Sequence, residues 1–302
     1  MININFTVNN IILNYFWILY QISLKGIVIE KDTITSVAIG GFDGMHVAHQ
    51  ELFKRLDSNG GILIIQNSYA NLSPFMHRQK HTTFPLYFYP LANIKHLTGE
   101  QFIKLINEEF PNLKKIVVGY DFHFGHLAAY DNEDLKKLFK GEVEIINEYK
   151  IDTIAVHSRV IREYLRDGNI LEANKLLGYD YTLAGYVIKG QGLGKKQFFP
   201  TINVEVTDFL IPQEGIYITK TTVNQICYES VSFIGHRATT DGKFAVETHI
   251  LLETFDEIVP KKVEITFIEK LRDNKKYEKF EELKKQIELD IKNASSWFLE
   301  HK

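Results

Sequence analysis

The chain has 302 residues, of which 45% are hydrophobic and 24% are charged, and its formal net charge is −3 at pH 7. This length gives room for two domains, the composition excludes a disordered chain, and the slightly acidic balance argues against a nucleic-acid-binding protein. The single cysteine, Cys227, cannot form an intrachain disulfide, so we expect a cytoplasmic location.

An apolar stretch, IILNYFWILY at residues 11–20, precedes the first motif. It is shorter than the about 20 residues that a membrane span needs. It also lacks the basic region and the small-residue cleavage site of a secretory signal. We therefore expect residues 1–33 to form an N-terminal extension before the folded domains, and we expect no membrane partner.

Strand-like and helix-like segments alternate in the first half of the chain. Apolar runs predict buried strands at 34–39, 61–66, 113–120 and 142–148. Helical spacing begins near Val47 and recurs at 98–110, 132–141 and 159–178. Because strands that alternate with helices favour a parallel sheet with helices on both faces, we expect an α/β domain over residues 34–180.

The period of the hydrophobic pattern changes after Tyr179. Strand-like segments then follow without helices between them, at 181–190, 215–223, 228–235, 244–253 and 262–269. Such a run of short strands suggests a small antiparallel β-barrel. The final helix is predicted at 280–294, with an apolar stripe made of Phe280, Leu283, Ile287 and Ile291. We therefore expect a barrel domain over residues 181–302.

A glycine-rich turn after the first strand is the main candidate for a nucleotide site. The run GGFDGMHVAH opens a helix, whose free N–H groups and positive end favour anions. His46 and His49 lie on the same helix face, so both can donate hydrogen bonds to one polyphosphate during nucleotidyl transfer. An ordinary pair of histidines remains an alternative, while zinc lacks further ligands nearby. The nucleotide-binding candidates are Gly41, Phe42, Asp43 and Gly44.

This run resembles the G-x-F-D-G-x-H-x-G-H pattern of the adenylyltransferase module in bacterial bifunctional FAD synthetases. These enzymes combine riboflavin kinase and FMN adenylyltransferase in one chain. Ala48 stands where the pattern has its last glycine. The resemblance implies a Rossmann-like nucleotidylyltransferase domain in which His46 and His49 stabilise phosphates.

Two further stretches are similar to the same module. VVGYDFHFG at 117–125 looks like the segment that lines the flavin side, which implies flavin contacts by Asp121, Phe122 and Phe124. VHSRVIR at 156–162 resembles the run that caps the triphosphate, which implies that Ser158 and Arg162 assist catalysis. An arginine fork suits a phosphate, although Arg162 taken alone would be read as a solvated helix charge.

A second glycine-rich run, GQGLGKKQFFPTIN at 190–203, lies in the barrel half. Glycines let a loop fold over a nucleotide and lysines meet phosphate charge, although such a hairpin alone is more often just a turn. Thr201 and Asn203 offer hard oxygen ligands for Mg²⁺. The run resembles the riboflavin kinase flap and its G-x-P-T-A-N motif, with Phe198 and Ile202 as departures. The nucleotide-binding candidates are Gly190, Gly192, Gly194 and Lys195.

The resemblance also nominates a base for riboflavin phosphorylation. FAVETHILLETF at 244–255 looks like the strand that carries this residue, which makes Glu247 the candidate. Strand alternation places Glu247 on the face opposite Val246, so it faces either a cavity or, as an ordinary barrel glutamate, the solvent. SFIGHRATT at 232–240 departs from the pattern, with Phe233 in place of Asn and Ala238 in place of Pro.

The resemblance therefore implies a two-step enzyme. Riboflavin would be phosphorylated by ATP to FMN in the barrel, and FMN would be adenylylated by ATP to FAD with release of pyrophosphate in the first domain. One alternative is an FAD synthetase whose impaired barrel only binds flavin. Others are a non-enzymatic flavin- or nucleotide-binding regulator and a different nucleotidylyltransferase. Residues 61–97 receive no assigned role.

Overall fold

The structure is a computed structural model that describes residues 30–67, 70–189, 199–237, 239, 241–252 and 261–301. The expected N-terminal extension lies outside the described residues as far as residue 29. So do residues 190–198 of the second glycine-rich run, which include the candidates Gly190, Gly192, Gly194 and Lys195 and the departure Phe198. Ala238, one of the 232–240 departures, also lies outside the described residues.

The chain divides into two compact units. The described part of the first, here called the sheet unit, falls within Met1–Gly40, Arg55–Ile64 and Phe84–Ile146. The second, here called the barrel unit, takes in Gly41–Lys54, Ile65–Thr83 and the chain from Asn147 onward. The GGFDG turn and the segment after β2 therefore pack with the barrel, although they come from the first half of the sequence. The expected domains at 34–180 and 181–302 concern where each activity resides, and they stay predictions.

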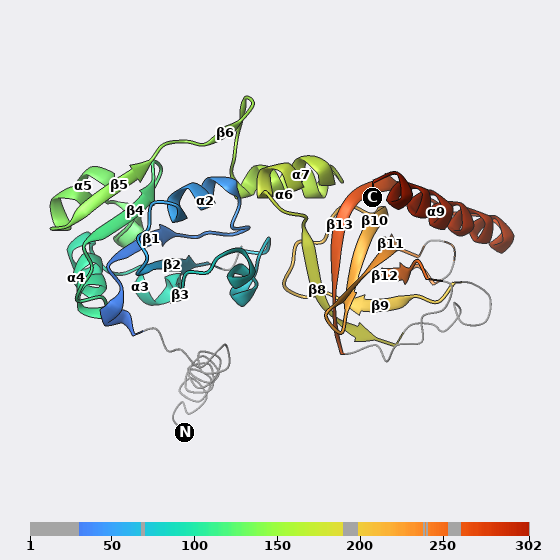
Figure 1. The fold of residues 1–302 in the computed structure, drawn as a ribbon, viewed down its shortest axis with the longest axis horizontal. Helices are drawn as coiled ribbons and strands as arrows, with labels where there is room; N and C mark the ends of the chain where they lie inside the picture. The colour runs from blue at the N-terminus through green and yellow to red at the C-terminus, as the bar shows by residue number, and fades with distance from the viewer. Residues whose placement is uncertain are drawn as a thin grey trace, which may run out of the picture. The chain divides into compact units, whose positions relative to one another are not determined.

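The sheet unit is built on a five-stranded sheet with the order β3-β2-β1-β4-β5 (Figure 1). β1 pairs in parallel with β2 and β4, and β4 pairs in parallel with β5. The central strand β1 is buried through Ile39, as expected for a strand flanked on both sides. The parallel sheet predicted from sequence is confirmed, and β3 is an addition to it. The strands are β1 Ser36–Gly40, β2 Gly60–Gln66, β3 Leu86–Pro90, β4 Lys115–Gly119 and β5 Glu142–Ile146.

Two helices of the sheet unit, α4 and α5, begin at side-chain caps. Thr98 forms a capping box with Gln101 at the start of α4. Asp131 accepts hydrogen bonds from the backbone N–H groups of Glu133 at 2.9 Å and Asp134 at 3.1 Å, which starts α5. The helices are α3 Leu91–Ile94, α4 Gly99–Glu109 and α5 Asn132–Leu138, with 3₁₀ turns η1 Lys31–Thr33 and η3 His126–Ala128.

The barrel unit starts with short helices that come from three parts of the chain. The predicted helix near Val47 is confirmed, and it ends at Phe53. α7 ends at Gly178, whose left-handed conformation closes the last turn. The elements are α2 Val47–Phe53, η2 Phe75–His81, α6 Ser158–Arg166 and α7 Ile170–Leu177, with a small hairpin of β6 Lys150–Ile151 and β7 Ile154–Ala155.

Six antiparallel strands then close into a barrel with the order β10-β11-β12-β9-β8-β13 (Figure 1). The predicted barrel is confirmed. β9 is a strand that the sequence pattern did not predict, because its run of four residues is too short to show a clear alternation. The strands are β8 Thr182–Ile188, β9 Ile202–Glu205, β10 Gly215–Val223, β11 Ile226–His236, β12 Phe244–Ile250 and β13 Lys262–Arg272.

One hydrophobic core joins the barrel interior to the helices before it. Inward residues such as Val246 and Phe267 belong to the same buried cluster as Ile161 of α6, Leu177 of α7 and Leu72. The helices and the segment at 70–81 therefore share their core with the barrel.

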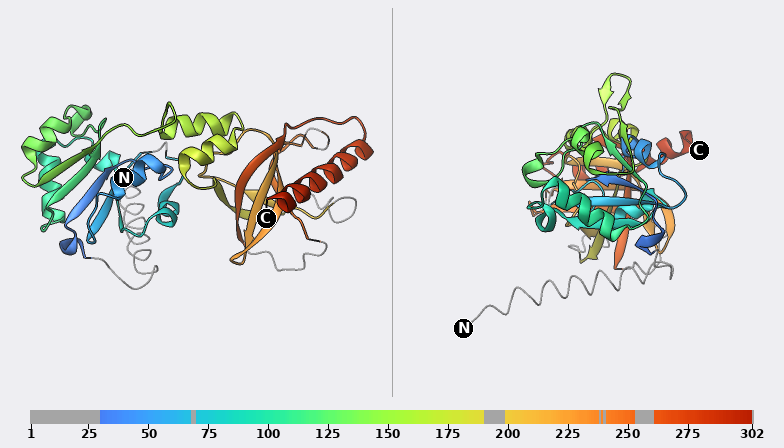
Figure 2. Two further views of the ribbon diagram at one scale, coloured as in Figure 1. Left: turned by 45° about the horizontal axis from the view of Figure 1, so that its top comes forward. Right: turned by 90° about the vertical axis from the view of Figure 1, so that its left-hand side faces the viewer.

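The C-terminal helix α9, Phe280–Glu300, lies along the outside of the barrel (Figure 2). It continues beyond the predicted 280–294, because Ala294 and Phe298 extend the buried stripe against Ile218 and Val231. Its buried Asp290 binds the Arg272 guanidinium of β13 through two hydrogen bonds, at 2.8 and 2.6 Å. This bidentate ion pair fixes the helix to the barrel. Within the described residues, none of the helices is both long and apolar enough to cross a bilayer.

Candidate active sites

The turn between β1 and α2 holds three residues in left-handed backbone conformations. The φ angles are +44° at Phe42, +82° at Gly44 and +41° at Met45. Glycine adopts this region without steric cost, whereas a residue with a side chain loses about 1–2 kcal/mol there. The turn is therefore strained, and contacts from the rest of the barrel unit must hold it in place.

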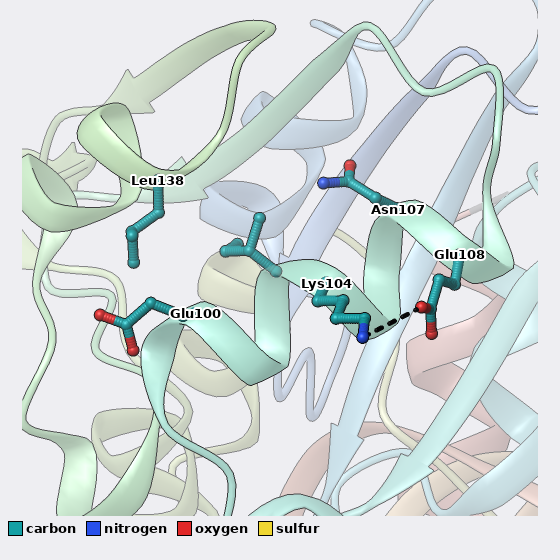
Figure 3. A pocket seen from close by; sticks show the side chains of 6 residues that line it. Glu100, Lys104, Asn107, Glu108 and Leu138 are labelled. Carbon is teal, nitrogen blue, oxygen red and sulfur yellow. Dashed lines mark ion pairs between the residues drawn. The ribbon is translucent and has the colours of Figure 1, made fainter.

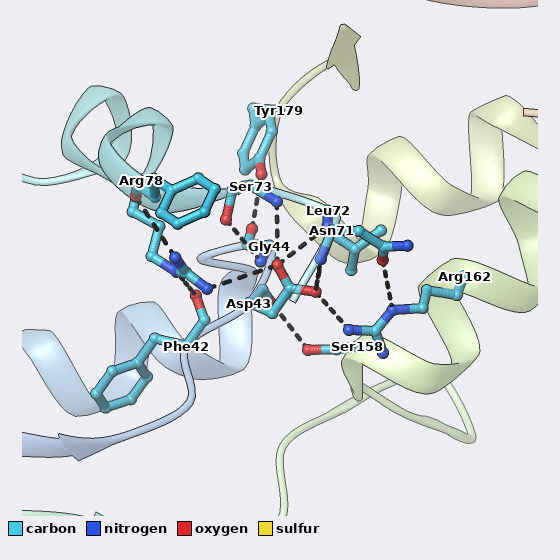
Figure 4. Close-up of polar contacts among 11 residues, drawn as sticks. Phe42, Asp43, Gly44, Asn71, Leu72, Ser73, Arg78, Ser158, Arg162 and Tyr179 are labelled. Carbon is cyan, nitrogen blue, oxygen red and sulfur yellow. Dashed lines mark hydrogen bonds and ion pairs between the residues drawn. The ribbon is translucent and has the colours of Figure 1, made fainter. Parts of the chain in front are cut away.

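The Asp43 carboxylate is the centre of those contacts (Figure 4). It accepts hydrogen bonds from three successive backbone N–H groups, those of Asn71 at 3.1 Å, Leu72 at 3.0 Å and Ser73 at 3.1 Å. It also forms an ion pair with the Arg162 guanidinium. The side chain of Asp43 is only 8% exposed, and its oxygens are occupied by these protein groups.

The backbone of the turn is held in the same way. Gly44 donates its N–H to the Ser73 hydroxyl at 2.8 Å, and its carbonyl accepts a hydrogen bond from the Tyr179 hydroxyl at 2.7 Å (Figure 4). The Asp43 carbonyl accepts a hydrogen bond from the Ser158 hydroxyl at 2.7 Å. Ser158 opens α6, so the first turn of that helix lies directly against the glycine-rich turn.

The two predicted catalytic histidines form a stacked pair. Their ring centroids are 3.5 Å apart with an angle of 18° between the planes. His46 caps α2, because its Nδ1 accepts a hydrogen bond from the His49 backbone N–H at 3.4 Å. Burial, with smaller contributions from the charges of His157 and Arg162, lowers the pKa of His46 to about 3. Burial also lowers the pKa of His49 well below 6.5.

Both imidazoles are therefore neutral at pH 7. Since Nδ1 of His46 is an acceptor, the ring proton is on Nε2, which is thereby a hydrogen-bond donor. The buried Nδ1 of His49 has no hydrogen-bond partner within the described part of the chain. A neutral ring tolerates this better than a charged one, because an unpartnered buried charge costs much more.

Arg162 contacts the Asp43 cluster, and its charge also acts on His46. Its Nε donates to the Asn71 side-chain oxygen at 3.0 Å, in addition to its ion pair with Asp43. The structure thus brings Ser158 and Arg162 into direct contact with Asp43, and the Arg162 charge contributes to the low pKa of His46. Arg162 is anchored in the protein, so it is not the freely solvated helix charge that its position alone would indicate.

In the barrel, Glu247 lies on the outer surface of β12. Its neighbours along the strand, Val246 and Thr248, point into the barrel and are buried. Its side chain is 19% exposed and pairs with Arg237, whose Nη1 lies 3.2 Å from Oε1. Burial raises the pKa of Glu247, and the charge of Arg237 opposes that rise. Glu247 therefore faces away from the barrel interior, but it is not an exposed surface glutamate.

Asn203 stands beside Glu247 on the same face, because β9 pairs with β12 in that register. The preceding Pro200 is held by His249, whose Nδ1 lies 2.7 Å from the Pro200 carbonyl oxygen. Thr201 between them is exposed. A hydroxyl, an amide oxygen and a carboxylate form a set of hard oxygen donors, which fits Mg²⁺ bound together with phosphates and water. Among the described residues there is no metal-binding group of three or more His, Cys, Asp or Glu side chains.

The three predicted flavin residues lie in the sheet unit. Phe122 and Phe124 are 9% and 4% exposed, and their rings stack with centroids 5.7 Å apart. Phe124 also packs against Phe102 and Tyr130. Asp121 alone is open to solvent. The aromatic pair therefore contributes to the core of this unit, and its contact with a flavin stays a prediction.

The sheet unit also has a surface pocket of about 350 Å³ between α4 and α5 (Figure 3). An exposed ion pair crosses part of it, with 3.7 Å between Lys104 Nζ and Glu108 Oε1. None of its lining residues belongs to a predicted site. They are Glu100, Ile103, Lys104, Asn107, Glu108 and Leu138.

Comparison with known proteins shows which proteins this chain resembles. A family model described as riboflavin kinase matches residues 177–298. The bifunctional riboflavin kinase/FMN adenylyltransferase of Listeria monocytogenes is 28% identical over 295 residues, which cover 87% of this chain and 92% of that protein. The protein of the same description from Bacillus subtilis is 26% identical and covers 89% of this chain and 94% of its own length.

The chain is similar over most of its length to bacterial bifunctional riboflavin kinase/FMN adenylyltransferases, and residues 177–298 match the riboflavin kinase model. A solved structure described as a macrolide-efflux protein from Streptococcus pneumoniae is similar as well, with a TM-score of 0.76 and 26% identity over 87% of this chain and 94% of that one. The fold predicted from the sequence, a parallel α/β domain followed by an antiparallel barrel and a helix, is thus also that of a solved protein.

Several residues of the candidate site carry no recognisable sequence signal. Asn71 and Ser73 contact Asp43 from a segment that contains no recognised motif. Tyr179 binds the Gly44 carbonyl, but in the sequence it only marks the change of hydrophobic period. Arg78 donates its Nε to the Phe42 carbonyl at 3.1 Å from the same segment. In the sequence, Arg78 is an arginine among aromatic residues, which is only a weak indication of a site. Its burial can be recognised only from the fold.

Proposed function

We propose that this chain converts riboflavin to FMN and FMN to FAD, using one ATP for each step. The proposal rests on one observation: the chain matches, over nearly their whole length, relatives whose names state both activities. The match therefore spans both halves of this chain. We assign adenylyl transfer to residues 34–180 and phosphoryl transfer to residues 181–302, and we expect both to take place in the cytoplasm.

In the adenylyl-transfer step, a phosphate oxygen of FMN attacks the α-phosphorus of ATP, and the bond from that phosphorus to the departing pyrophosphate breaks. No covalent intermediate on the protein is needed, because positioning and charge stabilisation suffice. We propose that the Nε2–H donor of His46 and the ring of His49 bind phosphate oxygens. Ser158 and Arg162 assist from the first turns of α6, where Arg162 is already held in place by Asp43.

The nucleotide would lie against the turn formed by Gly41, Phe42, Asp43 and Gly44. This turn leads from β1 to the N-terminal end of α2, and helix N-termini favour anions. Asp43 contributes here by holding the turn, because its own carboxylate is occupied by protein donors. The flavin ring would approach Asp121, Phe122 and Phe124.

In the kinase step, we propose that Glu247 accepts the proton of the riboflavin 5′-hydroxyl as its oxygen attacks the γ-phosphorus and ADP leaves. The charge of Arg237 opposes the rise that burial causes in the pKa of Glu247, and so favours the ionised form that a base requires. Thr201 and Asn203 would hold Mg²⁺, which when bound neutralises phosphate charge. The loop with Gly190, Gly192, Gly194 and Lys195 would cover the nucleotide.

A second candidate is an FAD synthetase whose barrel binds flavin without phosphorylating it. Phe233 favours it, since it stands directly opposite Glu247 on β11, where the family pattern has an asparagine. This side chain packs against the core beneath α9 and offers no polar group to a substrate.

Two assays on purified protein test the proposal. One measures pyrophosphate release from FMN, ATP and Mg²⁺, and the other measures transfer of the γ-phosphate to riboflavin. We expect both reactions, with phosphate transfer lost in Glu247→Gln. Pyrophosphate release without phosphate transfer would support the second candidate. Absence of both would overturn the proposal and leave a non-enzymatic binding protein.

A further inference from the structure

Arg78 is a buried cation beneath the glycine-rich turn. Its side chain is completely buried, at 0% exposure, within η2. Nε donates to the Phe42 carbonyl at 3.1 Å, and Nη1 donates to the Phe75 carbonyl at 3.4 Å. Nη2 lies 3.8 Å from Asp43 Oδ1 and has no hydrogen-bond partner among the residues described. A buried guanidinium nitrogen without a partner is costly, so its retention calls for an explanation.

Among the described side chains at the turn, positive charges outnumber negative ones. Asp43 supplies one negative charge, and it faces two guanidinium groups, Arg78 and Arg162. Each is largely or fully withdrawn from solvent, with side-chain exposures of 0% for Arg78 and 19% for Arg162. The neighbouring His46 and His49 are neutral and add no charge. Among these described side chains, positive charges exceed negative ones by one, and this charge acts strongly because water screens it poorly.

We propose that Arg78 is a positioning residue for adenylyl transfer. It holds the carbonyl of the strained Phe42 and adds buried positive charge behind the Asp43 turn that receives the polyphosphate. Since its side chain has no exposed surface, it acts through the turn and through Asp43 rather than by touching the nucleotide. This inference rests on the proposed adenylyltransferase activity.

The proposal separates Arg78 from its neighbour Lys80 on the same segment. Lys80 is 48% exposed and pairs with Glu264, which is 33% exposed. An exposed ion pair of this kind contributes little to stability. Lys80→Gln therefore removes a cation from η2 without touching the turn, and it is a matched control for Arg78→Gln.

The test compares full-length wild type, Arg78→Gln, Arg78→Lys and Lys80→Gln. For each, kcat and the KM for ATP are measured in FMN adenylylation, and riboflavin phosphorylation by the same sample serves as an internal reference. Displacing a bound reactant by about 1 Å costs on the order of 100-fold in rate. We expect Arg78→Gln to lower kcat for FAD formation by about that factor. Arg78→Lys, which keeps the charge, should recover part of the loss, and Lys80→Gln should match wild type.

Two results would overturn the proposal. One is adenylylation at the wild-type kcat in Arg78→Gln. The other is a parallel loss of both activities and of the melting temperature in Arg78→Gln and Arg78→Lys, which would make Arg78 part of the general core. If wild type itself forms no FAD from FMN, the proposed function fails first, and the two failures are thus distinguished.

Discussion

A histidine that caps a helix with one ring nitrogen has only the other nitrogen left for a substrate. In His46 the capping nitrogen is Nδ1, and the low pKa keeps the ring neutral, so Nε2–H is the single donor available to a phosphate. Removing one such charge-stabilising donor costs about 100-fold or more in turnover. We expect His46→Ala to reduce FAD formation from FMN by at least that factor and to leave riboflavin phosphorylation intact.

His96 offers a matched control for this experiment, because it is an exposed histidine in the sheet unit. His96→Ala should form FAD at the wild-type rate. FAD formation by His46→Ala at the same rate as this control would show that His46 has no part in adenylyl transfer.

The low pKa of His46 also makes stability depend on pH. Between the unfolded value of 6.5 and the folded value of about 3, the unfolded chain binds a proton that folded His46 does not. The free energy of unfolding is therefore highest above pH 6.5 in this respect and decreases as the pH falls towards 3. Urea unfolding above pH 6.5 and at about pH 5 measures the decrease. We expect it to be smaller in His46→Gln, and an equal decrease in both proteins would contradict the assignment.

Gly44 has both a conformational and a steric reason to be glycine. Its φ is +82°, and a Cβ there would lie 3.0 Å from Leu72 Cδ1 and 3.3 Å from Leu177 Cδ2. Gly242 has a similar φ of +71° with nothing within 4 Å, so Gly242→Ala has only the backbone cost, about 1–2 kcal/mol. We expect Gly44→Ala to lose more unfolding free energy than Gly242→Ala and to form FAD more slowly. Equal stability and normal FAD formation would contradict this.

At the scale of elements, the sequence predicted the helices and strands whose hydrophobic residues recur with a regular period. The strand before the GGFDG turn, the helix capped at Thr98 and the barrel strands each show alternation or helical spacing over enough residues to be recognised. β9 was missed because it has four residues after a proline-containing run. The segment at 70–81 was missed for a different reason, since its order comes from Asp43 and the barrel core rather than from a local pattern.

The same distinction between local patterns and distant contacts holds for the site residues. The motif placed His46, His49, Ser158 and Arg162 in one site, and the fold brings them to one turn. It did not reveal that the Asp43 carboxylate binds backbone N–H groups, because such contacts depend on a loop far along the chain. The motif also gave no structural role to Ala48, which stands where the pattern has its last glycine. In the structure its methyl group packs against the barrel-unit core.

One buried ion pair contributes to the attachment of α9. Asp290 and Arg272 have side-chain exposures of 5% and 23% and form two hydrogen bonds. Asp290→Asn leaves the guanidinium without its charge partner, and hydrogen bonds to charged groups contribute about 1.5–3 kcal/mol. We expect a loss of that size in urea unfolding, against almost none for the exposed Glu288→Gln on the same helix. Equal effects of the two variants would show that the ion pair contributes nothing.

At the scale of the whole molecule, the barrel unit contains the catalytic candidates of both reactions, whereas the flavin-binding candidates Asp121, Phe122 and Phe124 lie in the sheet unit. The turn with His46 packs with the barrel rather than with the sheet, and Glu247 lies on the barrel's own surface. Folding of the barrel unit is therefore a condition for both steps.

The most direct measurement is a time course with riboflavin, ATP and Mg²⁺ in which riboflavin, FMN and FAD are separated. We predict that FMN rises first and FAD follows, that His46→Ala stops at FMN, and that Glu247→Gln makes FAD only when FMN is supplied. If wild type leaves riboflavin unchanged and also makes no FAD from added FMN, the two-step function is wrong.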